Sequence, residues 1–247
     1  MNEPISSESE HLLTRYVFLL GSVAFPAGLV HLSEKQAREQ VQRSILMSEL
    51  IAQQMSGAFE NPRQVLTKGQ ASAHHRLLID VGSGAGLPAI PMAIALSERA
   101  RTEGGPALES VLVEPKRRAV AFLEKVVRDL DLKITVFHGS AQQAAADGFD
   151  GKGAFVTAKA LAEAKLALQL CAPLCETGGK IILTAKSEIE SPTKDLESSA
   201  GGIKSMGIKS MGIASMGIKS IGIASTELIT LSGGNHLTQR VLLATKS

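Results

Sequence analysis

The chain has 247 residues, of which 44% are hydrophobic and 20% charged, so it can bury the core of one soluble domain with an appendage. Its formal net charge of +2 permits a nucleic-acid partner without indicating one. Only 3% of the residues are aromatic and tryptophan is absent, which disfavours a broad surface for stacking nucleic-acid bases.

Residues 1–70 are predicted to form a helical extension. Two stretches, SESEHLLTRYVFLLGSV and SEKQAREQVQRSILMSELIAQQM, place apolar residues at helical intervals, and Ser33 is the expected N-cap of the second. The first apolar run follows acidic residues, has no basic leader and is too short to span a membrane. We therefore expect a cytoplasmic protein that does not bind a membrane. The stretch SGAFENPRQVLTKGQASAHH then predicts a linker that leaves His74 and His75 exposed.

Residues 71–247 show a different pattern, in which strands and helices alternate. Strands are expected at 76–82, 109–115, 133–139, 153–161 and 180–187, and helices at 87–100, 116–132 and 162–179. Such alternation is typical of an α/β, Rossmann-like fold with a doubly wound parallel sheet. The last segments, STELITLSGG and NHLTQRVLLATKS, predict a hairpin that adds antiparallel edge strands and completes a mostly parallel, seven-stranded sheet.

A five-residue repeat interrupts this pattern at residues 202–225, with the sequence GIKSMGIKSMGIASMGIKSIGIAS. Glycine at every fifth position disfavours a helix, and the period is too short for a solenoid. We interpret the repeat as an expanded surface loop with little order. The alternative is a loop that touches RNA through Lys204, Lys209 and Lys219, its only charged residues.

The two cysteines, Cys171 and Cys175, are expected to be reduced thiols. Their spacing of four suits one face of a helix, where both would fill the core. No other metal-ligating residues lie near them in the sequence, so we do not expect a metal site.

The glycine-rich turn GSGAGLP, which follows the first strand, is the most informative motif. It lacks the lysine of a phosphate-binding loop, and Leu87 stands where a dinucleotide-binding motif has its third glycine. Instead, Gly82, Gly84 and Gly86 follow a strand that ends with Asp80, which is the pattern of S-adenosylmethionine-dependent methyltransferases. Residues without a Cβ let the methionine part and the ribose approach the backbone, and the Asp80 carboxylate suits the positive groups of this cofactor.

Two further positions are expected to complete the cofactor site. Glu114 ends the second strand, where an acidic residue can accept the ribose hydroxyls; the alternative is a solvent-facing strand end. The polar stretch SERARTEGGPALES before it is interpreted as a loop. After the third strand, Ala141 and Gln142 would border the adenine, although Gln142 could also be an exposed residue at a helix start. His138 is interpreted as a packed histidine at the strand end rather than as a general base.

Several segments together resemble the bacterial small-subunit rRNA guanine-N7 methyltransferases, the RsmG (GidB) family. These segments are DVGSGAGLPAIPMAIAL, LVEPKRRAVAFLEKVVRDLDLKITVFHGSAQQ, FDGKGAFVTAKALAEA and GGKIILTAKS. The resemblance covers most of residues 77–190 and the closing strand. It implies a Rossmann-like class I methyltransferase that uses S-adenosylmethionine and acts on 16S rRNA or the small ribosomal subunit. We expect a monomer without a metal ion.

The resemblance also implies roles for individual residues. Those that line the cofactor site would be Gly82, Leu87, Ala141 and Gln142. Lys159 corresponds to a family arginine at the cofactor site, and Lys186 corresponds to a family lysine after the fifth strand. We take both lysines as candidates for holding the substrate or the cofactor carboxylate. In the N-terminal region, Ser44 and Met47 stand where the family has histidine and aspartate, and Ser48 is retained.

N7 of guanine is an unprotonated acceptor on the major-groove edge, so its methylation requires no base to remove a proton first. This agrees with the lack of an evident catalytic base in the sequence. The Lys116-Arg117-Arg118 cluster could contact phosphates or could be exposed charge at a helix start. Three hypotheses stay open: the rRNA methyltransferase, a methyltransferase of the same fold with another substrate, and a non-catalytic protein that binds the cofactor or RNA.

Overall fold

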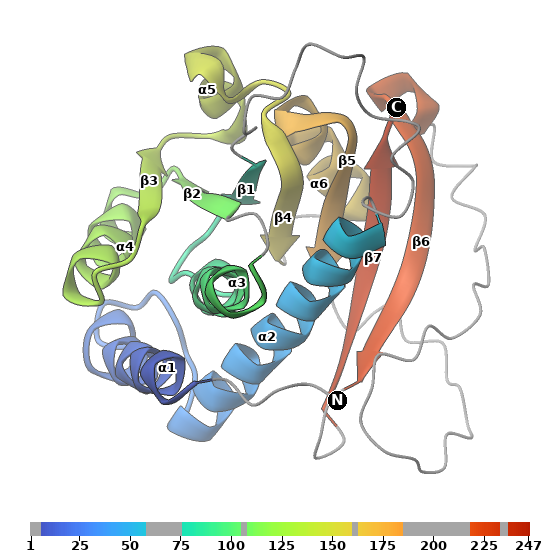
Figure 1. Cartoon of the computed structure of the whole chain (residues 1–247). Helices are drawn as coiled ribbons and strands as arrows, with labels where there is room; N and C mark the ends of the chain where they lie inside the picture. The colour runs from blue at the N-terminus through green and yellow to red at the C-terminus, as the bar shows by residue number, and fades with distance from the viewer. Residues whose placement is uncertain (1–5, 58–75, 105–107, 160–162, 185–217, 233–236) are drawn as a thin grey trace, which may run out of the picture.

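The structure is a computed structural model that describes residues 6–57, 76–104, 108–159, 163–184, 218–232 and 237–247. Within these residues, seven strands form one sheet in the order β3-β2-β1-β4-β5-β7-β6 (Figure 1). Their bounds are β1 Arg76–Val81, β2 Leu108–Glu114, β3 Ile134–His138, β4 Gly153–Lys159, β5 Cys175–Thr184, β6 Ile223–Ser232 and β7 Thr238–Lys246. The first five strands are parallel, and β7 runs antiparallel to both of its neighbours, β5 and β6.

Helices cover both faces of the sheet. Their bounds are α1 Ser7–Leu19, α2 Glu34–Gly57, α3 Ala89–Glu103, α4 Arg117–Asp129, α5 Ala141–Ala144 and α6 Ala164–Cys171. Residues of α5 and α6 share one apolar cluster with the sheet, whereas α2, α3 and α4 pack on the opposite face (Figure 1). On β1, the side chain of Leu78 belongs to one cluster and that of Ile79 to the other, as expected for a strand of a parallel sheet buried on both faces.

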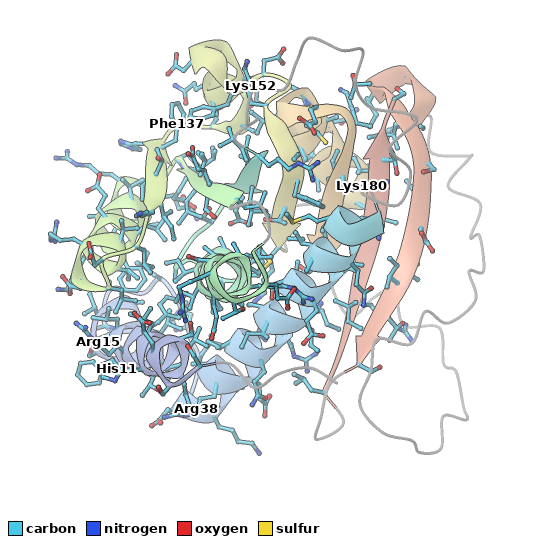
Figure 2. All side chains as sticks on the ribbon, in the orientation of Figure 1. His11, Arg15, Arg38, Phe137, Lys152 and Lys180 are labelled. Carbon is cyan, nitrogen blue, oxygen red and sulfur yellow. The ribbon has the colours of Figure 1, made fainter. Side chains whose placement is uncertain are left out.

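The two N-terminal helices pack directly on the α/β unit. Helix α1 continues into a π-helical turn at Leu20–Ala24, and its Arg15 guanidinium donates to the Asp129 carbonyl at the end of α4 over 2.9 Å (Figure 2). Helix α2 runs alongside α3 and reaches the β6–β7 hairpin. Ser33 is the N-cap of α2, as predicted, because its hydroxyl accepts from the Gln36 N–H over 3.3 Å.

Three boundaries predicted from the sequence are wrong. The helix expected at 162–179 ends at Cys171, because Pro173 lies in a short 3-10 turn at Ala172–Leu174 and β5 begins at Cys175. Both cysteines are free and buried, so they fill the core, although only Cys171 is helical. The polar stretch interpreted as a loop continues α3 to Glu103.

The third correction concerns the repeat. Residues 218–225 form a 3-10 turn at Ile218–Ile221 and the start of β6, where Ile223 is buried in the core. Burial of this side chain and pairing with β7 explain why the end of the repeat is a strand rather than a loop. Lys204, Lys209 and the rest of 202–217 lie outside the described residues. The hairpin is confirmed, with its second strand, β7, adjacent to β5.

Candidate cofactor and substrate site

The candidate site lies at the edge of the sheet where the five parallel strands end. Strand β1 has β2 on one side and β4 on the other, so the chain order reverses at β1. In open α/β sheets, ligands bind in the crevice beyond the strand ends at such a reversal. Asp80, Glu114 and Lys159, from three neighbouring strands, are all at or within one residue of the end of their strand.

The glycine turn between β1 and α3 has a left-handed backbone at all three predicted positions. The φ angles are +72° at Gly82, +56° at Gly84 and +89° at Gly86. Side chains other than glycine rarely adopt such angles, so this turn requires its glycines. The Gly82 N–H donates to the Val113 carbonyl over 2.8 Å, which fastens the turn to the end of β2.

The glycines have different surroundings. A Cβ on Gly86 would lie 2.4 Å from Ile90 Cδ1 and 3.2 Å from Leu123 Cδ2, so this position is closed by the core. A Cβ on Gly84 would meet only the Gly82 carbonyl oxygen, at 3.9 Å. The space beside Gly84 is therefore open, and part of a ligand could fit there against the backbone.

Glu114 connects this turn to the start of α4. Its carboxylate is 4% exposed and accepts hydrogen bonds from the Gly84 N–H and the Lys116 N–H, each over 2.8 Å. The alternative interpretation, a solvent-facing strand end, is therefore excluded. An ionised carboxylate has about four acceptor positions, so two bonds leave capacity for the hydroxyls of a ribose.

Asp80 is buried beside the turn, with an exposed fraction of 1%. Its carboxylate accepts a hydrogen bond from the Thr157 hydroxyl of β4 over 2.6 Å. Burial raises the pKa of Asp80 to about 6, against the lowering effects of the bonds from Thr157 and Ser83 and of the Lys159 charge. A carboxylate held at this cost is suited to a ligand that brings a positive charge.

Lys159 ends β4 and is held by helix α2. Its ammonium group donates a hydrogen bond to the Gln40 side-chain oxygen of α2. Burial lowers the pKa of Lys159, the Asp80 charge raises it, and the Arg43 charge lowers it further. Lys159 thus faces both the β1 end and α2, whereas Lys186, its predicted companion, lies outside the described residues.

A second contact joins the N-terminal extension to the site. Tyr16 of α1 is fully buried and donates its hydroxyl to the Ala85 carbonyl of the glycine turn over 2.7 Å. Burial raises the pKa of Tyr16 well above its ordinary value, with a smaller effect from the Asp80 charge, so the hydroxyl stays a donor. Leu87, predicted to line the site, packs against the same apolar cluster as Ala85.

The third predicted position follows β3. Ala141 is buried and begins α5, whereas Gln142 is exposed. Ser140 caps this helix, since its hydroxyl accepts from the Gln143 N–H over 3.2 Å. The expectation of a packed His138 is wrong, because β3 is the outer strand and its last residue is exposed.

Gln40, Thr157 and Tyr16 were not predicted from the sequence. A threonine in an apolar strand is a weak signal of an inward hydroxyl. Nothing in the local pattern around Gln40 or Tyr16 indicates contact with residues so distant along the chain.

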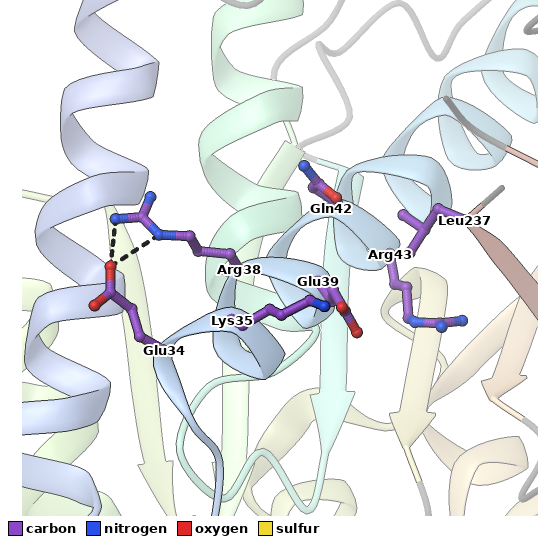
Figure 3. Close-up of a pocket in the computed structure, with 7 residues that line it drawn as sticks. All are labelled: Glu34, Lys35, Arg38, Glu39, Gln42, Arg43 and Leu237. Carbon is purple, nitrogen blue, oxygen red and sulfur yellow. Dashed lines mark hydrogen bonds and ion pairs between the residues drawn. The ribbon is translucent and has the colours of Figure 1, made fainter. Parts of the chain in front are cut away.

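The described residues also form a groove of about 790 Å³ on the first three turns of α2 (Figure 3). It is lined by Glu34, Lys35, Arg38, Glu39, Gln42, Arg43 and Leu237. None of these residues belongs to the glycine turn, and Arg38 is paired with Glu34 over 2.7 Å. The groove is therefore an open, charged surface next to the site rather than the place for the cofactor.

Neither a metal-binding cluster nor a membrane-spanning helix is found in the described part of the chain. No group of three or more His, Cys, Asp or Glu side chains there could hold a metal ion. Among the same residues, no helix combines the length and apolar character needed to cross a bilayer.

The sequence of this chain is similar to that of one known protein family. A family described as rRNA small subunit methyltransferase G matches residues 13–216. A protein of that name from Mycobacterium leprae is 30% identical over 172 residues, covering 70% of this chain and 59% of the relative. Another from Mycobacterium ulcerans is 36% identical over 115 residues, covering 46% of this chain and 62% of the relative. The chain thus spans about 59% of the length of the first relative.

Among solved structures, a protein from Klebsiella pneumoniae assigned as an O-methyltransferase shares the fold. The TM-score is 0.50 at 11% identity, covering 99% of this chain and 91% of that one. At this identity the likeness shows the fold alone. With the strand order, it shows the Rossmann-like class I methyltransferase fold expected from the sequence.

Proposed function

Because this chain belongs to the rRNA small subunit methyltransferase G family, we propose that it transfers a methyl group from S-adenosylmethionine to N7 of a guanine in 16S rRNA. The observation that supports this proposal most directly is the family match over residues 13–216, which includes the glycine turn, Glu114 and Lys159. The substrate would be the RNA alone or the assembled small subunit, and the protein would act in the cytoplasm as a monomer.

The residues at the glycine turn fit the cofactor. The open position at Gly84 would admit part of the cofactor against the backbone, with Gly82, Gly86 and Leu87 forming the rest of the turn. The remaining acceptor capacity of Glu114 suits the ribose hydroxyls. Asp80 would offset the positive charge of the methionine part, at a site where its own burial is costly.

The adenine would lie toward the start of α5. We propose that Ala141 and Gln142 border the ring, since Ala141 presents no bulk and Gln142 offers an exposed amide. The sulfonium of the bound cofactor supplies an electrophilic methyl group, which the protein itself need not activate.

The remaining task of the protein is alignment. The N7 lone pair is available without deprotonation, so the site must orient the base and exclude water. Such orientation can contribute roughly 7–11 kcal/mol to lowering a barrier. We propose that Lys159, steadied by Gln40, holds the base or the cofactor carboxylate, and that Lys186 assists. The guanine would be presented unstacked from structured RNA.

A methylation assay tests this function. Purified protein is incubated with radiolabelled S-adenosylmethionine and small subunits from a deletion strain, and N7-methylguanine is mapped along the RNA. We expect one modified guanine, absent from the deletion strain and restored by the wild-type protein but not by a Glu114→Ala protein.

Other outcomes separate the remaining hypotheses. An unchanged modification pattern in the deletion strain would overturn the rRNA assignment. If the cofactor nevertheless binds in calorimetry, the chain is either a methyltransferase for another substrate or a non-catalytic protein that binds the cofactor. If no binding occurs at millimolar cofactor, the chain is not an enzyme of this type.

A further inference from the structure

The segment that joins α1 to α2 exposes an aromatic pair. The Phe25 and His31 rings lie 6.2 Å apart at an interplanar angle of 78°, which is an edge-to-face arrangement. Phe25 is 51% exposed, and His31 is also exposed. In such a pair, the ring that presents its edge has both of its faces free of its partner. Phe25 is half exposed, so part of its ring is open to a planar group.

The segment that carries this pair contacts the helix that follows Glu114. Leu29, Val30 and Leu32 of the same segment pack against the apolar cluster that contains Ala85 of the glycine turn. The Arg118 guanidinium donates to the Ala27 carbonyl over 3.5 Å, and this arginine is two residues beyond Lys116, whose N–H binds the Glu114 carboxylate. The segment that carries the aromatic pair therefore packs beside the start of α4, on the same side of the sheet as the glycine turn.

Exposed positive charge lies beside it. Lys116, Arg117 and Arg118 are three successive exposed cations at the start of α4, and the first turn of that helix contains no acidic residue. Cations at a helix N-terminus are unfavourable because they oppose the helix dipole. Three of them at this end of a 13-residue helix indicate a ligand of negative charge.

We propose that Phe25 and His31, together with Lys116–Arg118, form an RNA-binding surface, which we call the aromatic rim. Phe25 stacks on an unpaired base near the target guanine, and the three cations contact the adjoining phosphates. One stacking position agrees with the low aromatic content of the chain, which excludes a broad platform. The inference rests on the proposed function, since it concerns how that substrate is held.

Tryptophan fluorescence tests the stacking directly. The chain contains no tryptophan, so a Phe25→Trp protein has a single indole fluorophore. Single-stranded polyadenylate about 12 nucleotides long is the probe, a length within the range bound by single-strand sites. We expect saturable quenching in the Phe25→Trp protein and none in a Phe18→Trp control, because Phe18 is 70% exposed but lies two turns earlier. Equal quenching in both proteins, or none in either, would overturn the proposal.

Affinity measurements test the same surface without a new fluorophore. Phe25→Ala should weaken polyadenylate binding by about 5- to 100-fold, whereas Phe18→Ala should leave it unchanged. Arg118→Gln should reduce the slope of log affinity against log salt by about 1. Equal affinities of the Phe25→Ala and Phe18→Ala proteins would contradict the stacking role.

The methyl-transfer assay distinguishes this inference from the function on which it rests. A protein that methylates rRNA while its Phe25→Trp form shows no quenching keeps the function and loses the aromatic rim. A protein whose Phe25→Trp form is quenched by RNA, but which methylates no rRNA, keeps the aromatic rim and loses the proposed function.

Discussion

The ends of β1 and β2 and the end of β4 lie at the same edge of the sheet but are completed in different ways. At β1 and β2, Glu114 bonds the Gly84 N–H, 30 residues away within one strand–turn–helix–strand unit. At β4, Lys159 is held by Gln40, 119 residues away on α2. The first region is therefore built by the α/β unit itself, whereas the second depends on the N-terminal extension.

This difference suggests that the two regions have separate roles, which mutations can test. Changes at the β1–β2 end should alter the fold of the turn and the affinity for the cofactor. If Lys159 holds the base rather than the cofactor carboxylate, changes at the β4 end should alter turnover while the cofactor still binds.

The largest effect is expected from Gly86→Val. The new side chain would meet Ile90 and Leu123, at a φ of +89° that a β-branched residue strongly disfavours. Strain and overpacking together should cost about 2–5 kcal/mol of unfolding free energy, measured by urea denaturation. Gly104→Val is the control, because Gly104 also has a left-handed φ, +71°, but nothing lies within 4 Å of its added Cβ. Similar losses in both proteins would show that the backbone angle alone, rather than the closed packing, makes Gly86 necessary.

Asp80→Asn should change two quantities that are measured independently: the pH dependence of the unfolding free energy and the affinity for the cofactor. The pKa of Asp80 rises from its ordinary 3.8 to about 6 on folding, so the folded state holds this proton more tightly than the unfolded state. This tighter proton binding stabilises the folded state, fully below pH 3.8, and the stabilisation is lost as the pH rises through about 6. Over this range the free energy of unfolding should fall by about 3 kcal/mol. Asparagine cannot ionise, so the variant should lack this pH-dependent loss of unfolding free energy.

The same Asp80→Asn protein should bind S-adenosylmethionine more weakly, as measured by calorimetry at pH 7.5. Asp147→Asn, at an exposed aspartate, is the matched control. Unaltered cofactor affinity in the Asp80→Asn protein would remove Asp80 from the site.

Gln40→Ala tests the β4 end. Loss of the oxygen that accepts from Lys159 should free this ammonium group and lower kcat about 10-fold, which corresponds to one hydrogen bond to a charged group. The cofactor Kd should stay unchanged, because the bonds of the glycine turn are intact. A raised Kd with normal kcat would instead assign Gln40 to cofactor binding and break the division between the two ends.

Tyr16→Phe is expected to have the smallest effect. It concerns both regions, because Tyr16 belongs to the N-terminal extension and its hydroxyl bonds the glycine turn. It removes the hydroxyl that donates to the Ala85 carbonyl, at a cost of about 1 kcal/mol in unfolding free energy. The cofactor Kd should rise several-fold, since the turn loses its support from α1. The exposed Ser22→Ala change, which removes a bond to the Phe18 carbonyl within the same helical segment, should leave both quantities nearly unaltered.

The difference between the β1–β2 end and the β4 end also explains which parts of the site could be predicted from the sequence. The strands, the glycine turn and Glu114 were predictable because strand periodicity and motif spacing are local properties. Gln40 and Tyr16 were not, since their partners are set by how α1 and α2 pack on the sheet. Local patterns also misplaced the end of α6, where Pro173 outweighed an apolar run that otherwise favours a helix.

The strand order has a consequence for how the chain folds as it is synthesised. Among the described strands, β7 lies between β5 and β6, so the neighbour of β6 there is one that follows it in the chain. Strand β6 therefore joins the sheet only once Thr238–Lys246 has been made and can pair with it. A chain cut just before β7 would therefore lose two strands of the sheet rather than one.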